Sequence, residues 1–169
     1  MNKFDLTEKL KEELKRRNLW EQEDDEDEDQ EENDSDEDQD SQEESSNHNE
    51  DFCEMVCQML HSQTQVHIFH LGTKSYAEHK ALQGYYEGVD ALTDGLVESY
   101  QGKYGLLTNY KSYKNQSYKN KNQVLKYFTG LLNMIEEKRD CCDDSYIQNQ
   151  IDTVQELIYS TMYKLKFLN

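Results

Sequence analysis

The chain has 169 residues and a formal net charge of −18, from 36 acidic and 18 basic residues. Residues 21–51 hold 19 of the acidic residues and no Lys or Arg, so the rest of the chain is close to neutral. No stretch approaches the ~18 apolar residues of a membrane span, and the charged start of the chain is unlike a signal peptide. We therefore expect one ordinary domain with an acidic block near its start, in an intracellular, cytoplasmic protein without membrane association.

Residues 1–20 predict a short amphipathic helix, which either packs on the folded domain or binds a partner. Residues 21–49 carry like charges that repel one another and have nothing apolar to bury, so we expect a disordered acidic linker. The linker is either a solubilising spacer or a charge mimic of nucleic acid that engages a basic protein partner.

Residues 50–169 predict an all-α domain, since proline is absent and glycine is sparse. Apolar residues recur every three or four positions, which predicts helices over about residues 50–71, 75–100, 123–140 and 144–167. Gly72 fits the end of the first of these helices, and Thr73 or Ser75 fits the N-cap of the second. A long Tyr/Lys/Asn-rich connection between the second and third helices favours a four-helix bundle.

The four cysteines form two pairs, Cys53/Cys57 and Cys141/Cys142. Both spacings suit a disulfide poorly, so we expect free thiols in a reducing compartment. Cys53, Cys57 and His61 recur every four residues on one helix face, which is a pattern for zinc or copper. Three ligands spread over two turns do not easily meet one ion, and the interpretation as buried thiols is favoured.

Histidines and carboxylates gather around the junction of the first two bundle helices. A helical wheel places the carboxylates of the second helix in a row that borders its apolar stripe. Such a row is usually a solvated shoulder, but imidazole and carboxylate groups that converge between helices also suit divalent iron, manganese or zinc. The candidate ligands are His67, His70, His79, Asp90, Asp94 and Glu98.

The spacing of His67, Gly72, His79, Asp94 and Glu98 resembles the ferroxidase segment of the Dps family, ferritin-like proteins named for DNA protection during starvation. The resemblance covers about residues 50–101. It implies a ferritin-like four-helix bundle that oxidises Fe(II) at a site shared between two subunits. One subunit would supply the two histidines, and the other a bridging aspartate and a glutamate.

The resemblance further implies a homo-oligomer, either a closed shell of twelve subunits or a dimer, that stores or detoxifies iron. The sequence departs from the family at Ile68, where a tryptophan is usual, at Ser75, where an aromatic is usual, and at Gln83, where a carboxylate is usual. His70 is a rival to His67, because a turn three residues shorter would align it. The segment TKSYAEHKAL is also similar to one in small phage proteins, which would place the protein in the host cytoplasm.

The alternative function is a catalytically silent four-helix-bundle scaffold or binding protein whose acidic segment engages a basic partner. The basic segment KYGLLTNYKSYKNQSYKNKNQVLK interleaves tyrosines that could stack on bases, although a solvated loop is the commoner interpretation. Because the acidic block repels phosphates, we expect weak or no DNA binding by the full-length protein.

Overall fold

The computed structural model describes the backbone of residues 38–168, with side chains from residue 48 onward. This part of the chain contains four α-helices and no strand. The helices are α2 (Asp38–Gly72), α3 (Tyr76–Tyr104), α4 (Lys121–Lys138) and α5 (Ser145–Phe167), with a 3₁₀ turn, η1 (Arg139–Cys141), between the last two. Between residues 38 and 168, no helix combines the length and apolar character that crossing a membrane requires.

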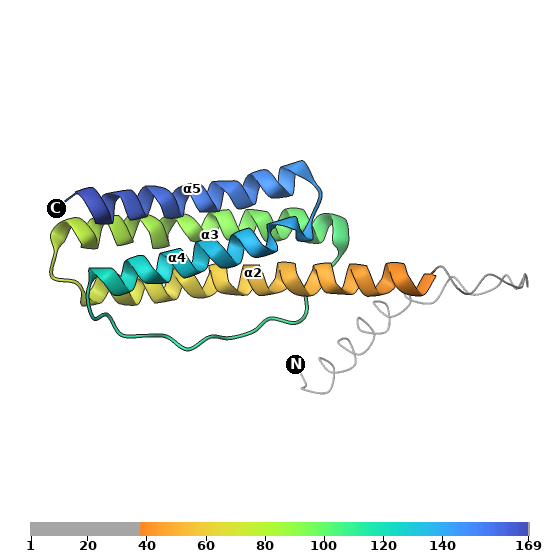
Figure 1. Ribbon diagram of the computed structural model, residues 1–169, viewed down its shortest axis with the longest axis horizontal. Coiled ribbons are helices and arrows are strands. Elements are labelled where there is room, and N and C mark those ends of the chain that lie inside the picture. The colour runs from red at the N-terminus through yellow and green to blue at the C-terminus, as the bar shows by residue number, and fades with distance from the viewer. Residues whose placement is uncertain (1–37, 169) are drawn as a thin grey trace, which may run out of the picture. The chain divides into compact units, whose positions relative to one another are not determined.

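The four helices pack side by side as a bundle in which neighbouring helices run antiparallel (Figure 1). α3 packs against α2 and α5, and α4 packs against the same two helices. Residues 105–120, which we call the strap, run the length of the bundle beside α2 (Figure 1). The strap returns the chain to the end at which α3 began, so α3 and α4 run in the same direction.

The core lies between the inward faces of all four helices, where the predicted apolar stripes are buried. Each of the largest side chains contributes roughly 1.5–3 kcal/mol through burial. The largest fully buried residues are Tyr85, Phe52, Phe69, Phe128, Met55, Met59, Leu82, Leu96, Ile135, Ile147, Ile151 and Ile158. The Tyr85 hydroxyl, which also reaches this interior, shares a 2.7 Å hydrogen bond with Ser62 Oγ, so α2 and α3 are joined by a satisfied polar pair.

Side chains cap the N-terminal ends of α3 and α4. Ser75 is the N-cap of α3, and its side chain accepts a hydrogen bond from the Glu78 N–H, as predicted. Asn120 caps α4 in the same way. Asp144 occupies the N-cap position of α5, but its carboxylate accepts hydrogen bonds from Lys103 Nζ and the Tyr104 hydroxyl instead. α3 ends at Tyr104, four residues beyond the predicted end. The bonds from Lys103 and Tyr104 to Asp144 join the last turn of α3 to the start of α5.

The start of α2 differs from the prediction. The acidic composition predicted a disordered linker up to residue 49, but the helical backbone begins at Asp38. Extending an established helix costs far less than nucleating one, and the Tyr100 hydroxyl donates a 2.6 Å hydrogen bond to Asn49 Oδ1 upstream of the expected boundary. The predicted helix over residues 1–20 and the linker up to residue 37 lie outside the described part of the chain.

The strap is held against α2 by polar contacts along its length. The buried Gln65 side chain donates to the Gln116 carbonyl at 2.8 Å and accepts from the Gln116 N–H at 2.7 Å. Tyr113 and Tyr118, at matching positions of the SYKN repeat, are half-buried, and their rings lie near those of His61 and Phe69 on α2. These two tyrosines are therefore used in packing rather than displayed to solvent.

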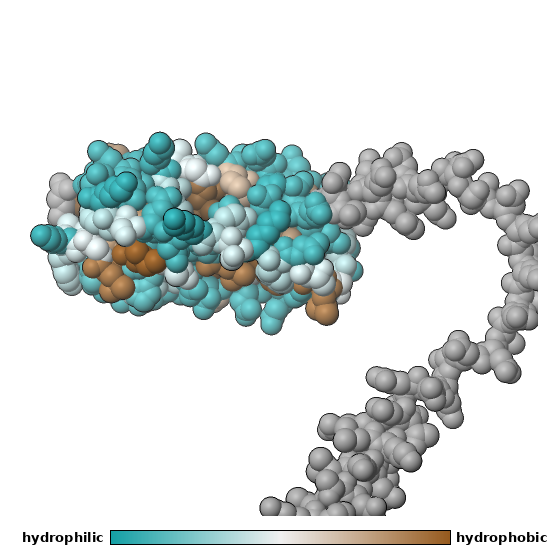
Figure 2. Space-filling model, turned by 90° about the horizontal axis from the view of Figure 1, so that it is seen from below, coloured by the Kyte–Doolittle hydropathy of each residue, from teal (hydrophilic) through white to brown (hydrophobic). Residues whose placement is uncertain are grey.

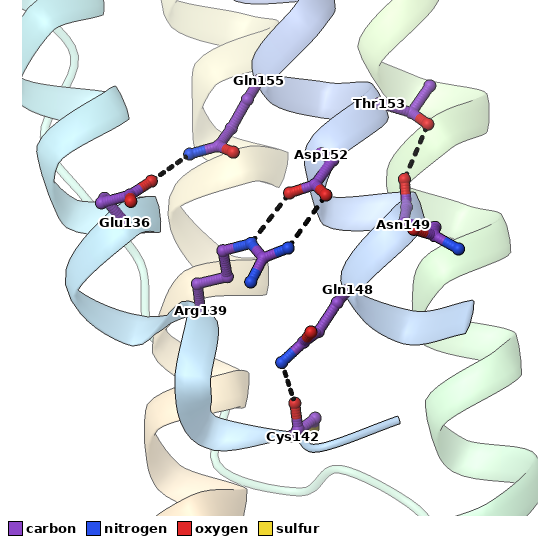
Figure 3. A network of polar contacts seen from close by, with 8 residues as sticks. All are labelled: Glu136, Arg139, Cys142, Gln148, Asn149, Asp152, Thr153 and Gln155. Atoms are coloured by element: carbon purple, nitrogen blue, oxygen red, sulfur yellow. Dashed lines mark hydrogen bonds and ion pairs between the residues drawn. The ribbon is translucent and has the colours of Figure 1, made fainter. Parts of the chain in front are cut away.

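The turn between α4 and α5 is closed by polar contacts (Figure 3). The Arg139 guanidinium forms a two-pronged contact with the Asp152 carboxylate, with nitrogen–oxygen distances of 2.8 and 2.9 Å. The Gln148 side chain donates to the Cys142 carbonyl at 2.9 Å. These bonds position the buried Cys142 next to the first turn of α5 (Figure 3).

Candidate functional site

The turn from α2 into α3 brings three histidines and one tyrosine together at one end of the bundle. The rings of His70 and His79 stack with centroids 3.6 Å apart and an interplanar angle of 25°. His67 stacks on Tyr86 at 4.2 Å, and its ring centroid lies 5.7 Å from that of His70. The three candidate imidazoles thus form one cluster. The turn between α2 and α3 has only three residues, so it brings the end of α2 close to the start of α3.

Reciprocal hydrogen bonds hold the His70 and His79 rings. His70 Nδ1 lies 2.9 Å from the His79 carbonyl oxygen, and His79 Nδ1 lies 3.1 Å from the His70 carbonyl oxygen. A carbonyl oxygen only accepts, so both Nδ1 atoms must carry the proton. In each neutral ring the lone pair is then on Nε2, which is the arrangement found when a backbone carbonyl orients a metal-binding histidine.

The three histidines differ in exposure. His70 is buried, His79 is half-buried and His67 is exposed. The structure therefore pairs His79 most closely with His70, the rival to His67, and places His67 at the solvent side of the cluster beside Tyr86.

The carboxylates lie apart from the histidines of the same chain. Asp90, Asp94 and Glu98 are all exposed on α3. Asp94 follows His79 by fifteen residues, which is about 22 Å along a helix. Among the residues with described side chains, no group of three His, Cys, Asp or Glu is placed to hold a metal ion. The structure thus brings the imidazoles together but leaves the acidic row, which we call the carboxylate stripe, facing solvent.

Gln83 is the position where the Dps resemblance led us to expect a carboxylate. Its Oε1 accepts a 2.5 Å hydrogen bond from Lys80 Nζ, and its Nε2 donates to Glu87 Oε1 at 2.7 Å. The amide therefore bridges two charged groups on the surface of α3.

Glu78 was not among the candidate ligands predicted from the sequence. It is only 6 % exposed, and its Oε2 accepts hydrogen bonds from Thr73 Oγ1 at 2.9 Å and the Tyr118 hydroxyl at 3.1 Å. Its Oε1 is buried and has no hydrogen-bond partner within the described residues. The signal in the sequence was the Ser75-x-x-Glu78 capping box, which marks the acid at the third helical position but not its burial.

Gly72, assigned from sequence to the end of the first bundle helix, also has a packing role. A Cβ at this position would collide with Tyr118 Cβ on the strap. Among the described glycines, only Gly105 has a positive φ. Gly72 is therefore required for the close approach of Tyr118 to α2 rather than for an unusual backbone conformation.

The described residues form a four-helix bundle with an imidazole-rich end and a separate, exposed carboxylate stripe. The chain belongs to a family of unknown function, DUF5856, whose model matches residues 70–165. The matched region includes His70, His79 and the carboxylate stripe, and it begins after His67. Neither the curated proteins nor the solved structures contain a match to the chain.

Proposed function

We propose that the protein is a Dps-like, iron-binding protein that oxidises Fe(II) at a site shared between two copies of the chain. The observation that carries this proposal is the pair of reciprocal hydrogen bonds that leaves the Nε2 lone pairs of His70 and His79 as potential ligands. Imidazole combined with carboxylate is a donor set that suits Fe(II). Iron is the substrate of this reaction: each Fe(II) gives one electron to peroxide or oxygen, and the Fe(III) product is stored or detoxified.

A second copy of the chain would supply the missing oxygen ligands. The histidine cluster and the carboxylate stripe are far apart in one chain, so a complete site requires that the histidine end of one copy meets the stripe of another. Asp94 would bridge the iron, Glu98 would complete the site, and Asp90 is one turn away on the same stripe. The exposure of all three carboxylates supports this arrangement.

The connectivity of the helices supports a ferritin-like bundle. A ferritin-like fold has one long crossover connection between its second and third bundle helices. The strap occupies this place, with short turns on either side of it. The free state of Cys53, Cys57, Cys141 and Cys142 fits a reducing cytoplasm.

DNA binding is not part of the proposed function. The tyrosines of the basic segment that could stack on bases include Tyr113 and Tyr118, which pack against α2. The acidic block at residues 21–51 would repel phosphates. We expect no salt-sensitive shift of duplex DNA by the full-length protein at physiological ionic strength.

Anaerobic Fe(II) titration of the full-length protein tests the proposal. Losing a hydrogen-bonding partner of a metal ligand weakens metal binding by roughly 10- to 100-fold. His79→Gln and Asp94→Asn each remove a ligand itself, so each should weaken Fe(II) binding by more than that. Glu156→Gln, which neutralises an exposed carboxylate on α5, is the matched control and should leave binding unchanged. Gln83→Glu should strengthen binding, because it adds a charged oxygen ligand.

Complementation between variants tests the sharing of the site. A purified mixed dimer of His79→Gln and Asp94→Asn chains has one intact histidine end facing one intact stripe. It should recover one of its two Fe(II) sites, whereas each variant alone recovers none. Unchanged Fe(II) affinity in both single variants would sink the proposal. The alternative, a silent scaffold whose acidic segment engages a basic partner, would then be favoured.

A further inference from the structure

A second group of potential ligands lies on α2, away from the histidine end. Cys53 and Cys57 are one helical turn apart, buried and free. Cys57 is a hydrogen-bonding neighbour of Cys53, and together with burial it raises the pKa of the Cys53 thiol. Ten residues separate Cys57 from His67, about 15 Å along the helix, so the two groups of ligands are distinct.

The strap aims a backbone N–H group at one of the two sulfur atoms. The Lys111 N–H donates to Cys57 Sγ at 3.1 Å, and the Asn109 backbone near Cys53 opposes part of the rise that burial causes in the pKa of that thiol. Hydrogen bonds from N–H groups stabilise a thiolate relative to a thiol. Lys111 also lies near Cys53, and its positive charge acts in the same direction.

Two pockets between the strap and α2 connect this pair to the surface. One, of about 160 Å³, is lined by Cys53 together with strap residues 106–109. The other, of about 320 Å³, is lined by Cys57, His61 and strap residues 110–113. Burial lowers the pKa of His61, so its imidazole is neutral at neutral pH. The His61 imidazole therefore adds no positive charge to the pocket beside Cys57.

The solvent-facing surface around the strap does not favour a protein partner over an ion. It is mostly hydrophilic, with apolar side chains in separate patches (Figure 2). The two pockets, of about 160 and 320 Å³, are small and suit an ion better than a peptide.

We propose that Cys53 and Cys57 bind one soft monovalent cation, Cu(I), as a pair of thiolates beneath the strap. Soft thiolate ligands favour Cu(I), zinc and iron–sulfur clusters over harder metals. A structural zinc site needs four protein ligands, and the side chains from residue 48 onward offer no group of three. Binding releases the two thiol protons to solvent and changes no oxidation state. Both cysteines precede the region that the family model matches, so the site is a feature of this chain outside that region.

Cu(I) titration of the reduced full-length protein against a chromophoric chelator tests this site. The unsubstituted protein should retain one Cu(I) per chain, and the Cys53→Ser/Cys57→Ser variant should retain none. Cys141→Ser/Cys142→Ser removes the other buried thiol pair and is the matched control, which should still retain one ion. X-ray absorption of the copper-loaded control protein should show thiolate sulfur neighbours, and Cys53 and Cys57 are the two cysteines that this variant retains.

The strap's contribution has its own matched pair of variants. Lys111→Pro removes the N–H that reaches Cys57 and should weaken Cu(I) binding by about 10- to 100-fold, as losing a hydrogen-bonding partner of a ligand does. Lys114→Pro, on the same strap, should have a much smaller effect. The proposal is overturned if the unsubstituted protein does not retain Cu(I). It is also overturned if Cys141→Ser/Cys142→Ser, rather than Cys53→Ser/Cys57→Ser, abolishes Cu(I) retention. The unsubstituted protein decides the question even where a substituted chain does not fold.

Discussion

Gly72→Ala should destabilise the protein, although alanine is the better helix former. Gly72 is the last residue of α2, and replacing glycine by alanine in a helix ordinarily gains about 0.5–1 kcal/mol. Here the new methyl group would collide with Tyr118 Cβ, which is attached directly to the strap backbone. Rotating the tyrosine ring cannot relieve that collision, so the strap itself must move. Overpacking of this kind costs roughly 1–3 kcal/mol, and we expect a net loss of about 1–2 kcal/mol.

Gly130→Ala is the matched control for this experiment. Gly130 lies inside α4, and a Cβ there has nothing within 4 Å. The control should therefore gain about 0.5–1 kcal/mol. Equilibrium urea denaturation of both variants measures the two free energies of unfolding, and shifts of the same sign would refute the reasoning.

A double-mutant cycle locates the cause at one carbon atom. Tyr118→Ala keeps Cβ and should leave most of the cost of Gly72→Ala in place. Tyr118→Gly removes Cβ and should abolish that cost. Equal relief in both backgrounds would mean that the ring, rather than Cβ, blocks the site.

Three further outcomes follow from the described contacts. Gln65→Leu leaves both backbone groups of Gln116 without their buried partner, so it should cost about 2 kcal/mol and speed amide hydrogen exchange in the strap. Burial depresses the pKa of His61 below its ordinary value of 6.5, so below that pH the unfolded chain binds more protons than the folded chain. The free energy of unfolding should therefore fall as the pH drops through 6.5. His61→Gln should flatten this pH dependence, as measured by urea titrations. Arg139→Gln breaks a partly exposed pair with Asp152 and should cost no more than about 1 kcal/mol by thermal denaturation.

The local features of the fold could be predicted because they depend on neighbouring residues. Helical periodicity identified the four bundle helices, and capping preferences left Thr73 or Ser75 as the N-cap of α3, of which the structure uses Ser75. The helical wheel placed Asp90, Asp94 and Glu98 at the edge of the apolar stripe, and all three are exposed. Composition failed at the start of α2, where helical backbone extends to Asp38 because a helix propagates beyond its packed region.

The candidate site depended on contacts between segments that are distant in the sequence. Periodicity tells which way a side chain points from its own helix axis, but the sharpness of a turn decides which ring it meets. The three-residue turn therefore stacked His79 on His70, where the spacing alone had favoured His67. In the same way, the path of the strap decided that Gly72 must lack a side chain.

The sequence by itself determined four amphipathic helices, two candidate caps for the second of them and a near-neutral domain behind an acidic block, since each follows from local composition and spacing. Only the tertiary structure decided that His70 and His79 each bond the other's backbone carbonyl, and that the strap presents the Lys111 N–H to Cys57. Those contacts arise when packing of the core brings separate segments within hydrogen-bonding distance, and no single segment encodes that distance.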